Sequence, residues 1–337
     1  RFAGDDRVPT DDMRAYYAER ARHGVGLIIT EGTVIDPVHA PPKPKEGAPG
    51  KVPGIYTDEQ IESWGRITDA MHDEGAKIAL QLWHCGRLGG EGAIGPSEWS
   101  SADGAYSCRA MTEADIARTI ADFALAAKHA RDGGFDAVEI HGAHGYLLHS
   151  FLDPTINTRD DAYGGSLDGR MRFPLEVTRA VRDAVGGAFP ILYRFSQWAV
   201  DDYARIVLND AHEVERFTRA ITGAGADALH PSTRDCTAPA FEDSDAPPET
   251  LAGITKRATG APVIAVGRVT TSRTFGADKP LDSTDPAPAI ELIEKGEADL
   301  LAVGRAMIAN PDWCEKVRAG KWEELRAFDA GMLERLE

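Results

Sequence analysis

Short apolar segments alternate with longer amphipathic segments along this chain. The apolar segments have the length of buried strands, and the amphipathic segments repeat their apolar residues at helical spacing. The predicted strands are residues 25–31, 77–83, 137–140, 190–196, 227–231, 262–267 and 299–305. The predicted helices are residues 10–22, 58–74, 112–131, 168–185, 210–222, 247–259 and 290–295, with a further helix beginning near Pro311. Such alternation is typical of a parallel sheet covered by helices.

The number of predicted strands favours one particular α/β architecture. Seven strands are one short of the eight in a (β/α)8 TIM barrel, so we expect the first strand to lie ahead of residue 1. The composition does not change abruptly along the chain, and residues 1–337 are therefore predicted to form a single domain. The alternative is an open doubly wound sheet. That fold usually carries a glycine-rich dinucleotide turn after its first strand, and no such turn follows residues 25–31.

Composition excludes several classes of partner. With 37 Lys and Arg against 54 Asp and Glu, the formal net charge is -17, which argues against nucleic acid or an anionic membrane surface as a partner. Neither a membrane-spanning run nor a signal-peptide pattern is visible. The four cysteines are scattered and form no zinc or iron–sulfur motif, so no metal site is predicted from them. Scattered thiols suit a reducing compartment, and a cytoplasmic protein is expected.

Two segments between predicted elements are long and polar. Residues 84–109 and the stretch up to residue 167 are both predicted to be irregular loops. Long irregular segments in a compact domain are usually functional or mobile.

Polar side chains stand at or just past the ends of the predicted strands. They are Gln81, His84, His141, His144, Tyr146, Arg194, His230 and Arg305, with Gly267 and Gly304 beside them. A barrel gathers these strand ends on one face, where its active sites lie. Gln81 and Arg194 interrupt apolar runs, so each needs a polar partner or a ligand. Each of the two also has a purely structural interpretation: a bond from Gln81 to the backbone, or an ion pair between Arg194 and Glu139.

The strongest candidate chemistry follows residues 137–140. His141 and His144 are spaced three apart, and Tyr146 comes two residues later. Histidine can bind a metal, act as a general acid or hold an anion. A tyrosine hydroxyl has an ordinary pKa of about 10 and suits protonation of a carbanion-like carbon. The cluster therefore indicates a functional site.

The last two predicted strands end in similar motifs. Residues 265–267 read Ala-Val-Gly, and residues 302–305 read Ala-Val-Gly-Arg. The loops after the seventh and eighth strands of such barrels often bind phosphate. Glycine lets the backbone approach a phosphate, and Arg305 adds positive charge. Gly267, Gly304 and Arg305 are therefore predicted to form a phosphate site.

These motifs together resemble the old yellow enzyme family of NADH:flavin oxidoreductases. The resemblance rests on the run from His141 to Pro154, together with residues 26–32, 81–87, 157–160, 163–166, 170–173, 194–196 and 303–305. It covers nearly the whole chain, in order. It implies a barrel with one noncovalent FMN.

The resemblance also implies roles for individual residues. Gln81 would bond the pyrimidine edge of the flavin, and Arg194 would stabilise its anionic reduced ring. Gly32 would lie against the ring, while Gly267, Gly304 and Arg305 would hold the phosphate. His141 and His144 would bind the carbonyl oxygen of an α,β-unsaturated substrate, and Tyr146 would deliver a proton to its α-carbon. NADH or NADPH would first reduce the flavin in the same pocket, giving ping-pong turnover with hydride passing from flavin N5.

The implied activity is thus that of an NAD(P)H-dependent ene-reductase acting on a small enone-type substrate, and a homo-oligomer is compatible with it. Two other functions stay open at this point. A metal-dependent barrel hydrolase would use His84, His141, His144 and His230 as ligands. A non-catalytic flavoprotein would keep the fold without the reaction. A functional role for Trp83, Tyr106 or Trp198 is as open as a role in packing.

Overall fold

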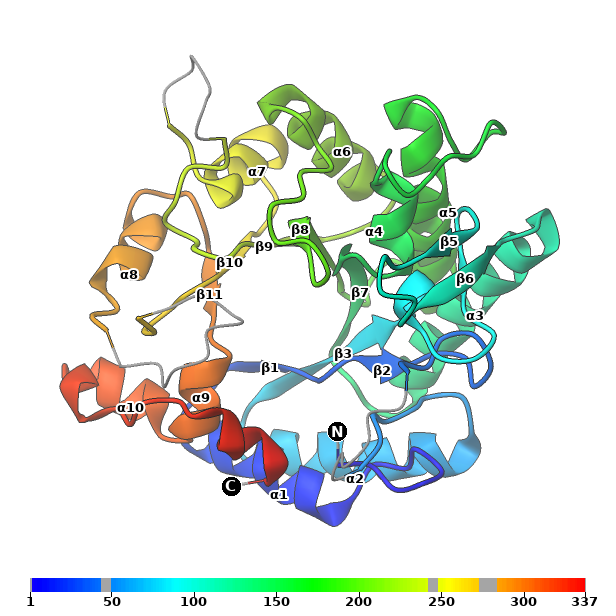
Figure 1. Cartoon of the computed structure of the whole chain (residues 1–337). Helices are drawn as coiled ribbons and strands as arrows, with labels where there is room; N and C mark the ends of the chain where they lie inside the picture. Colours follow the sequence, from blue (N-terminus) through cyan, green and yellow to red (C-terminus); the bar gives the residue numbers. More distant parts are fainter. Residues whose placement is uncertain (1, 44–49, 242–247, 273–283, 337) are drawn as a thin grey trace.

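The structure is a computed structural model that describes residues 2–43, 50–241, 248–272 and 284–336. Within these residues, one parallel sheet curls around the centre of the molecule (Figure 1). Its strand order is β1 (Leu27–Ile29), β3 (Lys77–Trp83), β7 (Ala137–His144), β8 (Ile191–Ala199), β9 (Ala228–Ser232), β10 (Ile264–Val266) and β11 (Leu300–Ala302), and the short β2 (Thr33–Val34) pairs with β3. Helices lie outside the sheet, between successive strands in the chain.

The described helices lie close to the predicted ones, with two exceptions. The helices are α1 (Asp11–Arg22), α2 (Asp58–Asp73), α3 (Glu113–Asp132), α4 (Leu147–Leu152), α5 (Leu167–Val185), α6 (Ala211–Gly223), α7 (Leu251–Thr259), α8 (Ala287–Glu294), α9 (Arg305–Ala309) and α10 (Trp313–Arg318), with single 3-10 turns at Gly86–Leu88, Trp322–Glu324 and Ala330–Glu334. Of these helices, α4 and α9 were not predicted. Thr57 and Thr112 begin α2 and α3 in capping boxes, where the threonine hydroxyl accepts from the N3 backbone N–H. None of the described helices combines the length and the apolarity that crossing a bilayer needs.

The predicted α/β architecture is confirmed. β3 has the bounds predicted for it, and the central strand β7 is buried along its whole length. Parallel strands with helices on one side and a packed interior on the other need such continuous apolar runs. The main core lies between the sheet and the helices and includes Phe123, Val138 and Phe217, all fully buried. The curled sheet brings the carboxyl ends of its strands to one face.

Both segments predicted to be irregular contain regular elements. Residues 84–110 include a small sheet with the order β4 (Ile94–Gly95), β6 (Ser107–Ala110) and β5 (Trp99–Ser100). These strands are two to four residues long, too short for an alternating pattern to be visible. The stretch after Tyr146 contains α4, whose six residues are all buried. A buried helix of this length shows no amphipathic period, because no side of it faces water.

Several predicted boundaries also move, and β7, for instance, continues to His144 instead of ending at Ile140. Residues 299–305 were predicted as one strand, but β11 ends at Ala302 and Arg305 is the first residue of α9. Only Val303 and Gly304 separate β11 from α9, and Val303 continues the apolar run of the strand. The predicted helix 247–259 starts at Leu251 in the structure, with Thr250 as its N-cap, and residue 247 lies outside the described residues.

Candidate active site

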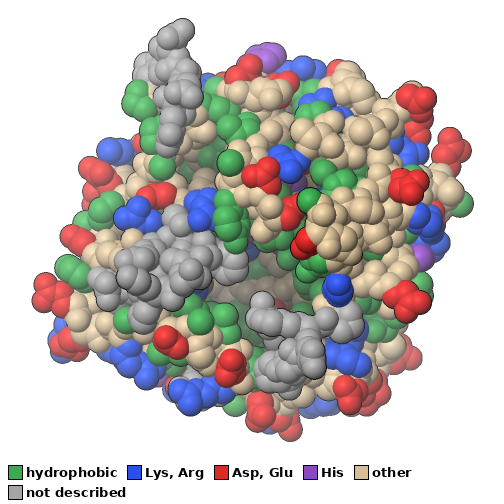
Figure 2. Space-filling model, in the orientation of Figure 1, with side chains coloured by type: hydrophobic (Ala, Val, Ile, Leu, Met, Phe, Trp, Pro, Cys, Tyr) green, Lys and Arg blue, Asp and Glu red, His purple; other side chains and the backbone are tan. Residues whose placement is uncertain are grey.

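A cavity of about 380 Å³ opens at the carboxyl ends of the strands. This volume is within the range of about 300–1,000 Å³ typical of small-molecule sites. The same face of the molecule is hollowed near its centre (Figure 2). All nine residues predicted to bind cofactor or substrate line the cavity: Gly32, Gln81, His141, His144, Tyr146, Arg194, Gly267, Gly304 and Arg305. The curl of the sheet has therefore brought together side chains that are far apart in the chain.

An irregularity in the pairing of β7 with β8 lies where His141 and His144 come to share one face. In a regular strand, residues three apart point to opposite sides of the sheet. The pairing of β7 with β8 shifts register between Gly142 and His144. Between the pairs Gly142–Phe195 and His144–Ala199, β7 advances two residues while β8 advances four. At this irregularity His144 turns back to the side of His141, and the two ring centroids lie 5.0 Å apart. Bulges and related irregularities often re-aim side chains next to active sites.

The backbone of His144 is itself unusual. Its φ is +65°, in the left-handed region that few non-glycine residues adopt. The backbone N–H of His144 donates to Ser196 Oγ at 2.9 Å, and its ring is held by two further contacts. Strained residues of this type cluster at functional sites. The strain is consistent with a ring that must point into the cavity.

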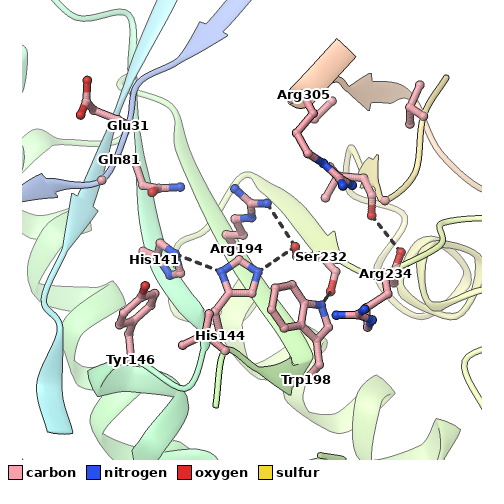
Figure 3. Close-up of a pocket in the computed structure, with 18 of the residues that line it drawn as sticks. Glu31, Gln81, His141, His144, Tyr146, Arg194, Trp198, Ser232, Arg234 and Arg305 are labelled. Atoms are coloured by element: carbon pink, nitrogen blue, oxygen red, sulfur yellow. Dashed lines mark hydrogen bonds between the residues drawn. The ribbon is translucent and has the colours of Figure 1, made fainter. Parts of the chain in front are cut away.

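Hydrogen bonds link the two histidines to Arg194 (Figure 3). The N–H of Ala143 points at His141 Nδ1 at 3.3 Å, and His141 Nε2 lies 3.3 Å from His144 Nδ1. His144 Nε2 lies 2.8 Å from Ser232 Oγ, which also accepts from Arg194 Nη2 at 3.1 Å. For neutral rings, one assignment of protons satisfies every contact: each histidine carries its proton on Nε2.

Both histidines are neutral at physiological pH. Burial lowers the pKa of His141 to about 3, and the positive charge of Arg194 contributes in the same direction. Burial and Arg194 also hold the pKa of His144 well below its usual value. A neutral Nε2–H is a hydrogen-bond donor without a net charge. The pair can therefore polarise a carbonyl oxygen without forming an ion pair.

Aromatic rings frame this part of the cavity. Tyr146 packs edge-on against Trp83, with ring centroids 5.0 Å apart, and against His141 at 5.2 Å. Trp198 lies 4.4 Å from the His144 ring, and its indole N–H donates to the carbonyl oxygen of Ser232. Trp83 and Trp198, whose roles the sequence left open, thus both line the site, whereas Tyr106 does not belong to the described lining. We call His141, His144, Tyr146, Arg194 and Ser232 the histidine end.

Positive charge gathers on the opposite side of the cavity. Figure 3 shows Arg234 and Arg305 across from Gln81, His141 and Tyr146. Burial lowers the pKa of Arg305, and the nearby charge of Arg234 lowers it further. Arg268 also lines the cavity and pairs with Asp235 at 2.7 Å. We call Arg234, Gly267, Arg268, Gly304 and Arg305 the arginine end.

The three glycines predicted to contact a cofactor differ in what a side chain at each position would meet. A Cβ at Gly32 would meet the Trp83 ring at 2.8 Å. At Gly267, where φ is +144°, a Cβ would lie 2.6 Å from the carbonyl oxygen of Thr233. Packing alone therefore requires glycine at these two positions. A Cβ at Gly304 would have nothing within 4 Å among the described residues, so Gly304 is the position where a side chain would simply fill the cavity.

Some lining residues were not predicted. Ser232, Arg234 and Arg268 lie at or just past the ends of β9 and β10, so the strand-end rule that found Arg305 applied equally to them. Two predicted candidates lie elsewhere: His84 and His230 are buried and do not belong to the described lining of the cavity. His84 Nδ1 accepts from the N–H of Gly86, while His230 bonds Glu139. Nowhere in the described residues do three His, Cys, Asp or Glu side chains come together as metal ligands, which leaves the hydrolase alternative without a ligand set.

A model of the NADH:flavin oxidoreductase / NADH oxidase family matches residues 1–324. The chain belongs to this family. The NADH oxidase of Thermoanaerobacter brockii is 33% identical over 96% of this chain and 48% of its own length. The 12-oxophytodienoate reductase 7 of Oryza sativa subsp. japonica is 34% identical, over 92% of this chain and 80% of its own. The chain spans about half the length of several curated relatives.

Solved structures of the family agree with the fold. Morphinone reductase in complex with tetrahydroNAD has a TM-score of 0.79 and 28% identity, covering 99% of this chain and 87% of its own. The old yellow enzyme homologue from Zymomonas mobilis has a TM-score of 0.79 and 27% identity, with 100% and 90% coverage. The predicted resemblance and the TIM-barrel fold class are thereby confirmed.

The residues of the cavity fit the flavin that the family name implies. Two residues that line it, Trp83 and Arg194, each carry a buried N–H, at Nε1 and Nε respectively, that has no hydrogen-bond partner in the part of the chain that the structure describes. Unpartnered buried donors are costly, so a bound ligand with acceptors is the natural way to satisfy them. The arginine end supplies charge for a phosphate, and Gly304 leaves room beside it.

Proposed function

We propose that this protein is an FMN-dependent oxidoreductase that uses NADH or NADPH to reduce the activated C=C bond of α,β-unsaturated carbonyl compounds. One observation carries the proposal: a neutral histidine pair and Tyr146 share one cavity with Arg194 and an arginine-rich end. The names of the relatives support it, since they include a 12-oxophytodienoate reductase and an NADH oxidase, and one neighbour was solved with tetrahydroNAD. In this proposal residues 1–337 form a single flavin-binding barrel domain that works in the cytoplasm.

The cavity walls would hold FMN at both ends. Arg305, with the backbone at Gly267 and Gly304, would bind the phosphate, and Gln81 and Arg194 would bind the polar edge of the ring. Bound FMN would supply the redox chemistry, accepting a hydride from reduced nicotinamide and passing one to the alkene. The protein supplies position and charge.

The histidine end would bind and activate the alkene substrate. The Nε2–H groups of His141 and His144 can turn from their present acceptors to one carbonyl oxygen. Hydrogen-bond donors held where negative charge develops stabilise the transition state. Here the two donors would draw electron density from the alkene, so that its β-carbon accepts hydride. Tyr146, next to His141, would then donate a proton to the α-carbon. In this proposal the two histidines bind the carbonyl oxygen, and Tyr146 supplies the proton.

A visible absorption spectrum of the purified protein tests the proposal. We expect flavin bands that bleach on anaerobic addition of NADPH or NADH and return on addition of cyclohexenone. Recovery with the enone, compared with the saturated cyclohexanone as control, shows that the C=C bond is the oxidant. A protein that stays colourless after incubation with FMN, or a reduced flavin that the enone does not reoxidise, would refute the proposal.

A further inference from the structure

A fully buried carboxylate lies beside the cavity without lining it. Glu139 is the third residue of β7 and is 0% exposed. Its Oε1 accepts from Gln81 Nε2 at 2.7 Å, and its Oε2 is 2.5 Å from His230 Nδ1. TIM barrels usually fill their interior with layers of branched apolar side chains. A glutamate at this depth therefore needs a reason.

The strand register places four polar side chains in two adjacent levels of the barrel, because Arg194 is opposite His141, two residues after Glu139 on β7. Gln81 on β3 is opposite Glu139 on β7, and Arg194 on β8 is opposite His230 on β9. These are four consecutive strands of the sheet. Gln81 and Arg194 line the cavity, whereas Glu139 and His230 lie behind them. Glu139 can therefore act on a ligand only through its neighbours.

The environment keeps Glu139 ionised. Burial alone would raise its pKa, but His230, Arg194 and the Gln81 hydrogen bond together lower the pKa to about 2. Burial also lowers the pKa of His230, so at neutral pH its ring donates a hydrogen bond to Glu139 without carrying a charge. A fixed negative charge thus lies next to Arg194, whose pKa burial lowers and Glu139 raises.

An ionised carboxylate also fixes its neighbour's orientation. Carboxylate oxygens only accept hydrogen bonds, so Gln81 must turn its NH2 group toward Glu139. Its carbonyl oxygen is then left for a ligand in the cavity. A neutral side chain at position 139 could accept or donate, and the Gln81 amide could then flip.

We infer that Glu139 is a positioning residue for the flavin that the proposed function places in this cavity. It holds Gln81 as an acceptor toward the flavin ring and partly offsets the charge of Arg194. Because Arg194 favours the anionic reduced flavin, an uncompensated Arg194 would make the flavin easier to reduce. Glu139 therefore keeps the reduction potential of the bound flavin lower than Arg194 alone would set it.

The test is the two-electron reduction potential of bound FMN in three variants. Glu139→Gln removes the charge and keeps the shape of the side chain. We expect the affinity for reduced flavin to increase about tenfold relative to that for oxidised flavin, which corresponds to a rise of the reduction potential by about 30 mV. Glu139→Asp keeps the charge and should stay near the wild-type potential. The exchange Gln81→Glu with Glu139→Gln keeps the paired carboxylate and amide but moves the charge to the cavity wall, so the potential should fall below wild type.

The expected shifts of the reduction potential, upward in Glu139→Gln and downward in the exchanged pair, distinguish a positioning role from a merely structural one. A structural role predicts lower thermal stability in Glu139→Gln and an unchanged potential, and that result overturns the inference. If Glu139→Gln does not fold, the exchanged pair decides by the direction of its shift, and a potential equal to wild type overturns the inference there too. Wild-type protein that binds no FMN overturns the proposed function together with this inference. Bound flavin with an insensitive potential overturns the inference alone.

Discussion

The two ends of the cavity are built in different ways. At the histidine end, strand residues are joined by a continuous series of hydrogen bonds from Ala143 to Arg194, and both histidines are buried. At the arginine end, the side chains come from segments that follow β9, β10 and β11, and two like charges raise each other's energy. A bonded, buried donor set suits directional chemistry. Clustered positive charge suits an anion whose position needs less precision.

The largest effect should come from Tyr146→Phe at the histidine end. Loss of the proton donor should slow flavin reoxidation by cyclohexenone by about 10²–10⁴-fold, the usual value of general acid catalysis. Reduction of the flavin by NADPH needs no proton from Tyr146 and should change less than about threefold by the same reasoning. Stopped-flow absorbance measures the two half-reactions separately.

The ring contacts of Tyr146 provide the control. Phe keeps the edge-on packing against Trp83 and His141, so the shape of the cavity should not change. Equal slowing of both half-reactions would mean that the hydroxyl acts on the flavin or on cavity structure. In that case the assignment of Tyr146 as the proton donor to the alkene would be wrong.

The positions of the site residues at strand ends explain which of them could be predicted from the sequence. His141, Arg194 and Arg305 were identifiable because a polar residue at the end of an apolar strand needs a partner, and a barrel gathers those ends. Ser232 and Arg234 obey that rule too, at and just past the end of β9, and the rule could have found them.

Other features needed coordinates. The register shift that turns His144 toward His141 depends on pairing between β7 and β8, which lie about fifty residues apart in the chain. The role of Glu139 depends on its contacts with β3 and β9. From sequence it was only a possible ion-pair partner for Arg194. The structure gives the direct hydrogen bonds of Glu139 to Gln81 and His230 instead, with Arg194 acting through its charge.

A smaller but still large effect is expected when both histidines are removed. His141→Ala with His144→Ala should weaken binding of a phenol to the oxidised enzyme by about 100-fold, because two hydrogen bonds to an ionised oxygen are lost. The charge-transfer band expected for a phenolate over FMN should fade in parallel. Unchanged titration by the phenol would show that the anion binds elsewhere, for instance at the arginine end.

The pH dependence of phenol binding sharpens this result. With the pKa of His141 near 3 and that of His144 well below 6.5, neither ring titrates between about pH 5 and 8. Wild-type affinity should therefore rise with pH toward the phenol's own pKa of about 10. Cationic histidines would give the opposite sign, with affinity falling as pH rises through about 6.5.

The smallest of these effects belongs to the arginine end, and a matched pair of variants measures it. Arg305→Gln should weaken FMN binding by the apoprotein about tenfold, the low end for a hydrogen bond between charged groups, and the loss should shrink at high salt. Arg268→Gln is the control, because Arg268 is half-exposed and already neutralised by Asp235. Its effect should be about twofold or less, as for surface ion pairs. Titration of apoprotein with FMN, followed by quenching of flavin fluorescence, gives both constants. Equal losses in the two variants would mean that the arginine end acts as a diffuse field, with no single contact to the phosphate.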